Sequence, residues 1–166
     1  MDKVITCYKD NICYYIDKYG DMILRVAFSY MKNTYDAEDI VQEVFLKLVS
    51  NKYTFDNTEH EKAWIIRVTI NICKNKLKSF WFNKTSEISD EIKFYDKINE
   101  NDSVLKAVMD LPVSYRMVIH LYYYEQYTTK EIADVIGKKE STVRSLLYRG
   151  REKLKNILKE DYDFEE

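Results

Sequence analysis

The sequence has few of the residues that interrupt regular structure: three glycines and one proline in 166 residues. Turn-rich β folds and glycine loops that cradle phosphates depend on these residues, so their scarcity argues against both. No apolar run approaches the roughly 20 residues that cross a bilayer. The N-terminus also lacks a basic start followed by an apolar stretch, so we expect neither secretion nor membrane insertion.

The residues that carry metal or catalytic chemistry are scarce as well. The chain has Cys7, Cys13 and Cys73, without a Cys-x-x-Cys pair, and two histidines, His60 and His120. An odd number of scattered cysteines predicts reduced, packed thiols in a cytoplasmic protein. No Ser-His-Asp order and no cluster with metal-ligand spacing is present. We therefore expect no enzyme activity, no metal and no cofactor.

Apolar residues recur at helical spacing through the first half of the chain. The spacing predicts a helix over 12–31, with a break at Gly20. Asp36 is a good N-cap for a second helix, and the polar stretch 51–61 reads as a loop before a third helix over 60–82. The second helix is expected to bury Ile40, Val41, Val44, Phe45, Leu48 and Val49.

The sequence therefore predicts an all-α protein with two small helical domains. We expect the first over residues 1–82 and the second over 104–160. The polar stretch 83–103 is the candidate linker, and residues 161–166 form an acidic tail.

Charge is segregated along this layout. Residues 62–84 hold six basic residues and no acid, and residues 128–159 hold nine basic and four acidic residues, a net +5. Between them, residues 85–102 hold six acids and two lysines, a net −4. Two basic helices on either side of an acidic connector predict two contacts with nucleic acid.

The strongest local pattern is a helix-turn-helix over 128–144. Thr128 or Thr129 can cap a short helix, small Ala133 allows a close helix approach, and Gly137 supplies the left-handed residue that ends the helix. The second helix would present a polar face to the major groove. That face holds Ser141, Thr142, Arg144, Ser145, Tyr148 and Arg149. An ordinary helical hairpin with a solvated basic face is the alternative.

Two further faces are ambiguous from the residues alone. Asp39, Gln42, Glu43 and Leu46 form an acidic face on the second helix, which could dock a basic partner helix or be solvated. The third helix carries a basic face with Arg67, Asn71, Lys74 and Lys78. The preceding loop holds Tyr53 and Phe55, which could stack on exposed bases or anchor the loop.

Three segments in order resemble the extracytoplasmic-function (ECF) group of bacterial sigma factors, the promoter-recognition subunits of RNA polymerase. YDAEDIVQEVFLKL at 35–48 is similar to region 2.1/2.2, and AWIIRVTIN at 63–71 to regions 2.3/2.4. LPVSYRMVI at 111–119, followed by the helix-turn-helix, is similar to region 4. The gap between these matches leaves no room for a folded region 3.

The resemblance implies a role for each face. The residues that would dock on the clamp helices of the polymerase β′ subunit are Asp36, Asp39, Gln42, Glu43 and Leu46. Those implied in −10 strand binding are Phe55, Arg67, Asn71, Lys74 and Lys78, with Phe55 in a loop that receives a flipped base. The −35 element would be read by the polar face of the helix-turn-helix. The polymerase β flap and an anti-sigma factor are further implied partners.

We therefore expect a cytoplasmic sigma factor that recruits core polymerase to promoters and helps to open the DNA. The alternative is a stand-alone helix-turn-helix regulator that binds duplex operators. Such a regulator would need neither the acidic face of the second helix nor Phe55 in the loop.

Overall fold

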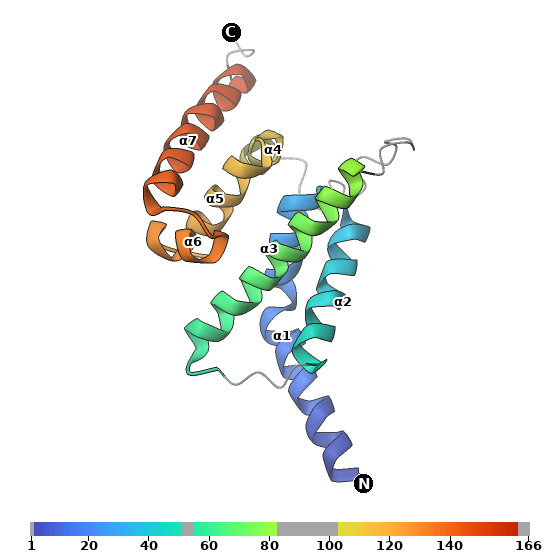
Figure 1. The fold of residues 1–166 in the computed structure, drawn as a ribbon. Coiled ribbons are helices and arrows are strands. Elements are labelled where there is room, and N and C mark those ends of the chain that lie inside the picture. The colour runs from blue at the N-terminus through green and yellow to red at the C-terminus, as the bar shows by residue number, and fades with distance from the viewer. Residues whose placement is uncertain (1, 51–54, 83–102, 163–166) are drawn as a thin grey trace. The chain divides into compact units, whose positions relative to one another are not determined.

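The structure, a computed structural model, describes residues 2–50, 55–82 and 103–162, and it divides into two compact units. Unit 1 comprises residues 1–89 and unit 2 residues 90–166. All regular structure in the described ranges is helical, which confirms the predicted all-α class (Figure 1). The predicted linker lies outside the described residues except for its last position, as do Tyr53 and most of the acidic tail. Within these ranges, no helix has the length and hydropathy of a membrane span.

Unit 1 is built, in its described part, from three helices that pack side by side: α1 (Asp2–Met31), α2 (Thr34–Ser50) and α3 (Thr58–Phe82) (Figure 1). Each helix contributes one apolar face to a shared core, as helical periodicity requires. The side chains with under 2% exposure there include Ile23, Val26, Ile40, Val44, Ile65, Ile66 and Ile70.

The structure corrects several details of the sequence-based helices. The helix α1 runs through Gly20 without a break, because one helical glycine costs only about 1 kcal/mol and the core holds the residues that follow it. The cap of α2 is Asn33 rather than Asp36: its Oδ1 accepts a bond from the Tyr35 N–H at 2.9 Å. Asn57 similarly accepts from the His60 N–H at 2.8 Å, so α3 begins inside the stretch expected to be loop.

Two side chains expected inside are at the surface. Val49 is 47% exposed, because it lies in the last turn of α2 beyond the shared core. Cys13 is also exposed, whereas Cys73 is fully buried. The expectation of packed thiols therefore holds for Cys73 and is wrong for Cys13.

Unit 2 contains α4 (Ser103–Asp110), α5 (Val113–Tyr123), α6 (Thr129–Ile136) and α7 (Glu140–Tyr162). Pro112 stands between α4 and α5, where the residue before a proline avoids the helical region. The buried Arg116 guanidinium donates from Nη1 to the carbonyls of Met109 and Leu111, each at 2.8 Å. These bonds satisfy carbonyls at the end of α4 that no helical N–H reaches, and they fix the angle at which α5 begins.

The helix-turn-helix has the predicted boundaries. Thr128 and Glu131 form a capping box at the start of α6, with the Thr128 N–H donating to Glu131 Oε2 at 2.8 Å. Gly137 ends α6 in the left-handed conformation, with φ of 69°. Val143 and Leu147 are buried, so α7 turns its apolar face toward unit 2 and its polar face outward.

Candidate functional site

The acidic face predicted on α2 is present and lies at the surface. Asp39, Gln42 and Leu46 are exposed, Glu43 and Asp36 are half-buried, and Asp36 lies in the first turn. Leu46 is 66% exposed, so an apolar side chain adjoins the carboxylates, as a helix-docking surface requires. Within unit 1, Asp39 Oδ2 lies 3.7 Å from Lys76 Nζ on α3, and Glu43 Oε1 lies 3.9 Å from Lys47 Nζ.

The basic face predicted on α3 also forms. Arg67, Asn71, Lys74 and Lys78 recur at intervals of three and four residues, so they project from one side of the helix. Arg67, Asn71 and Lys78 are exposed and Lys74 is half-buried. This side offers cations for a phosphate backbone and an amide for a base edge.

Phe55 lies at the start of this basic face. Its ring centroid is 5.6 Å from that of Trp64 and 6.0 Å from that of His60, both in the first turns of α3. The ring is half-buried, so one part packs on α3 while another part remains accessible. Sequence reasoning did not give Trp64 this contact, although its position nine residues after Phe55 was visible.

A polar hollow of about 300 Å³ joins the α2 and α3 faces. The acidic side contributes Glu43 and Lys47, and the basic side contributes Asn71, Asn75 and Lys76. Trp64, Val68 and Ile72 supply apolar wall. The hollow places Glu43, which is expected to bind polymerase, next to Asn71, which is expected to bind DNA, and sequence spacing alone did not show this.

Glu61 in the first turn of α3 is a hydrogen-bond acceptor for three side chains of α1. Tyr19 Oη donates to it at 2.5 Å, Lys18 Nζ at 3.0 Å and Tyr15 Oη at 3.3 Å. Burial alone would raise the pKa of Glu61, but the bonds from Tyr19 and Lys18 lower it overall. Burial and the bond to Glu61 in turn raise the pKa of Tyr19 to about 12. We call these four residues the Glu61 network.

In unit 2, the outward face of α7 carries the residues predicted to read duplex DNA. Arg144 donates from Nη2 to Glu140 Oε1 at 2.8 Å, and the same oxygen accepts from Thr129 Oγ1 at 2.6 Å. The bonds from Thr129 and Arg144 lower the pKa of Glu140. Because Thr129 belongs to α6, this arrangement holds the Arg144 guanidinium in a fixed place beside the turn.

The other residues of that face are exposed: Ser141, Thr142, Ser145, Tyr148 and Arg149. Ser145 already donates its hydroxyl proton to the Ser141 carbonyl at 3.0 Å, so its oxygen can act toward DNA only as an acceptor while that bond persists. Tyr148 is 66% exposed, so a large aromatic side chain also lies on this face.

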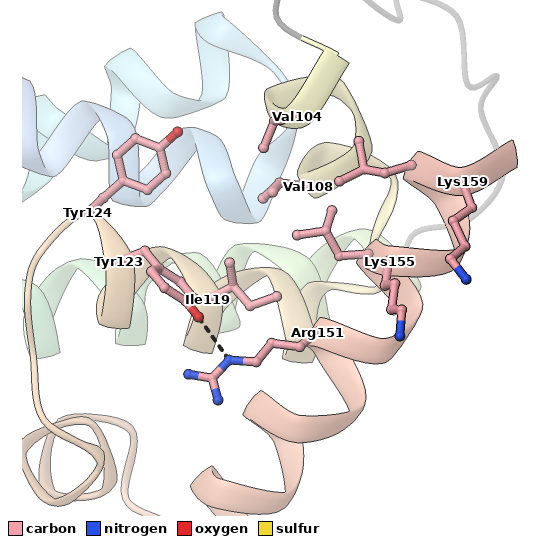
Figure 2. A pocket seen from close by; sticks show the side chains of 10 residues that line it. Val104, Val108, Ile119, Tyr123, Tyr124, Arg151, Lys155 and Lys159 are labelled. Atoms are coloured by element: carbon pink, nitrogen blue, oxygen red, sulfur yellow. Dashed lines mark hydrogen bonds between the residues drawn. The ribbon is translucent and has the colours of Figure 1, made fainter. Parts of the chain in front are cut away.

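Unit 2 also has an apolar groove of about 750 Å³, which sequence reasoning missed. Figure 2 shows α4, α5 and α7 around it, with Val104, Val108 and Ile119 in its wall. Arg151, Lys155 and Lys159 line one side at intervals of four along α7, and none of the ten described lining residues carries a carboxylate. Arg151 is held at the edge of the groove, where its Nε donates a hydrogen bond to Tyr123 Oη at 2.9 Å.

His120 is buried in α5, stacks on Tyr124 at 5.3 Å and has Nε2 3.7 Å from Glu125 Oε1. In the part of the chain that the structure describes, no group of three or more His, Cys, Asp or Glu residues could hold a metal ion.

Models of known protein families match a segment in each of the two units. The family model described as Sigma-70 region 2 matches residues 15–81, and the model described as Sigma-70, region 4 matches residues 101–154. The two matches therefore lie on the unit with the α2 and α3 faces and on the unit with the helix-turn-helix.

Curated relatives extend the match along most of the chain. RNA polymerase sigma factor SigV of Bacillus subtilis is 35% identical over 143 residues, which cover 82% of this chain and 85% of SigV. ECF RNA polymerase sigma factor SigW of the same organism is 23% identical, covering 87% of each chain. The chain belongs to the ECF group of the sigma-70 family of RNA polymerase sigma factors. Membership in this family decides against a stand-alone regulator.

Solved structures share the fold. The sigma factor RpoE of Bartonella quintana, solved with the anti-sigma factor NepR, aligns with a TM-score of 0.71 at 18% identity, covering 90% of this chain and 97% of RpoE. CnrH, solved with the cytosolic domain of CnrY, aligns with a TM-score of 0.68 at 19% identity, covering 92% of this chain and 90% of CnrH.

Proposed function

We propose that the chain directs core RNA polymerase to promoters in the cytoplasm, with unit 1 docking on polymerase and capturing the −10 strand. The observation that carries this assignment is the pairing of two unlike faces in unit 1. The acidic face on α2 includes the exposed Leu46. The basic face on α3 lies on the other side of the polar hollow, and Phe55 packs at the start of that helix. A stand-alone operator-binding protein would need neither the acidic face nor the aromatic residue beside α3, because it binds duplex DNA through its helix-turn-helix.

The α2 face is proposed to dock on the β′ clamp helices. Asp36, Asp39 and Glu43 supply negative charge for a basic helix, and Leu46 supplies an apolar contact at the C-terminal end of the surface. The ion pairs of Asp39 with Lys76 and of Glu43 with Lys47 are long and exposed. Such pairs are weak, so a partner cation can replace them at little cost.

The α3 face is proposed to hold the melted −10 strand. An unstacked base needs an apolar surface for its ring and polar partners for its edge. Phe55, backed by Trp64, supplies the first, and Asn71 can supply the second. Arg67, Lys74 and Lys78 lie along the same side of α3, where they can follow the phosphates.

Unit 2 is proposed to read the −35 element as duplex. The N-terminal part of a recognition helix enters the major groove, and Arg144 and Arg149 lie on the exposed side of that part of α7. The apolar groove with its row of cations is proposed to take an apolar, acidic segment of the polymerase β flap, since its charge would complement Arg151, Lys155 and Lys159. An anti-sigma factor is a further proposed partner, supported by the shared fold of RpoE, which was solved with the anti-sigma factor NepR.

The −10 proposal is tested at Phe55 with two substitutions. Phe55→Leu keeps an apolar side chain against Trp64 but removes the flat ring, whereas Phe55→Ala removes both. Stacking on one aromatic ring is worth roughly 1–3 kcal/mol, so both variants should slow promoter opening about 5- to 150-fold while closed-complex binding changes little. Permanganate reactivity of the −10 thymines measures opening, and a pre-melted bubble should partly restore transcription.

The thermal melt of the free protein separates stacking from packing. If Phe55 captures a base, Phe55→Leu opens promoters poorly although its melting temperature is close to that of the wild type. If Phe55 serves only to pack on α3, Phe55→Leu opens promoters normally, Phe55→Ala lowers the melting temperature, and the bubble rescues nothing.

A further inference from the structure

The Glu61 network includes the first turn of α3, where His60 contacts the Phe55 ring, but it belongs to neither of the proposed binding faces. Glu61 accepts hydrogen bonds from residues 42 to 46 positions earlier in the chain, all on α1. Its side chain is only 13% exposed, and the Lys18 ammonium lies over the rings of Tyr14 and Tyr19 at about 5 Å. A set of bonds this dense, between two helices that already share an apolar core, fixes one end of α3 in a defined place.

That end of α3 is where the loop residue Phe55 is held. Glu61 donates its backbone N–H to the Asn57 carbonyl at 3.1 Å, and the Asn57 side chain caps the helix through the His60 N–H. Phe55 then packs on His60 and Trp64, one residue before and three residues after Glu61. The contacts therefore run without a gap from α1, through Glu61, to the Phe55 ring.

We propose that Glu61 is a positioning residue for promoter opening: by fixing the first turn of α3 against α1, it holds the Phe55 ring in the place from which it captures an unstacked base. The inference rests on the proposed role of Phe55. Glu61 itself touches no base. Its acceptor bonds to Tyr15, Lys18 and Tyr19 set where α3 begins, and a ring displaced by about 1 Å stacks less well on its target.

The test is a double-mutant cycle in the holoenzyme, between Glu61→Ala and Phe55→Leu. In the otherwise wild-type chain, Glu61→Ala should slow promoter opening about fivefold, within the range of coupling found for residues in one contact network. In the Phe55→Leu background the same substitution should slow opening less than twofold, because no ring remains to be positioned. Glu61→Gln, whose amide oxygen can still accept from Tyr19 and Lys18 while its amide nitrogen can donate to Tyr15 Oη, should retain more than half of the wild-type rate.

A matched control distinguishes positioning from loss of stability. Ser29→Ala removes a buried 2.8 Å bond from Ser29 Oγ to the Val26 carbonyl within α1, ten residues, or about 15 Å, along the helix from Tyr19 of the Glu61 network. It should lower the melting temperature of unit 1 without slowing promoter opening at 25 °C. In a Trp81→Phe background, Trp64 is the remaining tryptophan, and Glu61→Ala but not Ser29→Ala should increase acrylamide quenching of its fluorescence.

Each outcome has a distinct meaning. Equal slowing by Glu61→Ala in both backgrounds, or slowing by Ser29→Ala as large as that by Glu61→Ala, would overturn the positioning role and leave the role of Phe55 intact. If the Glu61→Ala variant opens promoters at the normal rate while Phe55→Leu opens them slowly, the positioning role is also overturned and the role of Phe55 is kept. Normal opening in Phe55→Leu would overturn the proposed capture of a base, and the positioning role with it.

Discussion

The two cysteines that the structure describes have opposite surroundings. Cys13 is exposed, while Cys73 is fully buried, and burial raises the pKa of the Cys73 thiol to about 12. The reactive form of cysteine is the thiolate, so at pH 8 Cys73 combines a negligible thiolate fraction with no access for a reagent. Oxidants in the cell should therefore meet Cys13 long before Cys73.

A thiol assay checks this difference. With Cys7 and Cys13 replaced by serine, the native chain should react with a disulfide reagent at pH 8 only as fast as it unfolds, and fully once denatured. Rapid labelling of the native variant would show that the α3 core opens locally, contrary to the packing around Cys73.

Arg144 and Arg149 differ in how they are held, and this should be visible in binding. Arg144 is paired with Glu140, whereas Arg149, five residues further along α7, is exposed and makes no side-chain hydrogen bond or ion pair with the described residues. If Arg144 makes a bidentate contact with a base, Arg144→Ala should cost roughly 1–3 kcal/mol and relax specificity at one −35 position. Arg149→Ala should weaken all sequences alike and flatten the salt dependence if it contacts phosphate.

These effects are separated by measuring how tightly holoenzyme with each full-length variant binds duplexes that carry the −35 element, over a series of salt concentrations. Lys106→Ala on α4 removes an equal charge from an exposed site away from the recognition face and serves as the control. Promoter affinity and specificity that are the same in all three variants would rule out the assigned −35 face.

At the scale of helices, the crossing of α5 and α7 depends on Gly150. A Cβ at this position would lie 3.0 Å from Ile119 Cδ1 and 3.3 Å from Tyr115 Cβ. Alanine would gain about 1 kcal/mol in helix propensity but lose about 1–3 kcal/mol to overpacking, because the Tyr115 Cβ is fixed to the backbone. We therefore expect Gly150→Ala to destabilise unit 2 by about 1 kcal/mol, a loss of roughly 4–8 °C in its melting temperature.

A second substitution tests the cause of that loss. Ile119→Val removes the Cδ1 atom, which makes the closest of these contacts, so Gly150→Ala combined with Ile119→Val should recover part of the melting temperature relative to the sum of the single effects. A melting temperature that rises in Gly150→Ala alone would mean that α5 and α7 separate readily and that helix propensity prevails.

Local chemistry made some helices predictable and left others uncertain. The boundaries of α6 were visible because a capping threonine, a glutamate three residues later and Gly137 lie next to one another in sequence. The break predicted at Gly20 was wrong, because a glycine breaks a helix only when tertiary packing does not hold its neighbours. Phe55 and Glu61 could not be placed from sequence at all, since their partners lie on other segments: Trp64 across a loop, and α1 more than 40 residues away.

At the scale of the whole molecule, recruitment to polymerase should depend on charge at particular places and not on total charge. Asp39→Lys with Glu43→Lys changes the α2 face, and Asp21→Lys with Glu38→Lys makes the same change in net charge at other exposed sites of unit 1. Since all four residues lie at or near the surface, stability should change by only about 0.5 kcal/mol in either pair. Pull-down with core polymerase should be weakened strongly by the first pair and little by the second.

The outcome also bears on the α2–α3 hollow. Replacing Asp39 and Glu43 by lysine leaves Lys76 and Lys47 without their carboxylate neighbours and makes that side of unit 1 more basic. Binding of the free protein to a −10 single strand should therefore rise while core binding falls. Equal core binding by both charge-reversed proteins would contradict the docking assignment.

Each unit is made from one continuous stretch of chain, and this has a consequence for the order of events during synthesis. Unit 1 ends at residue 89, which is 73 residues before the end of α7 at Tyr162. At about 5–20 residues per second, those residues take roughly 4–15 s to add, whereas small helical domains fold within milliseconds. Once it has cleared the ribosome tunnel, the surface proposed to bind polymerase can thus be finished seconds before the helix proposed to read the −35 element exists.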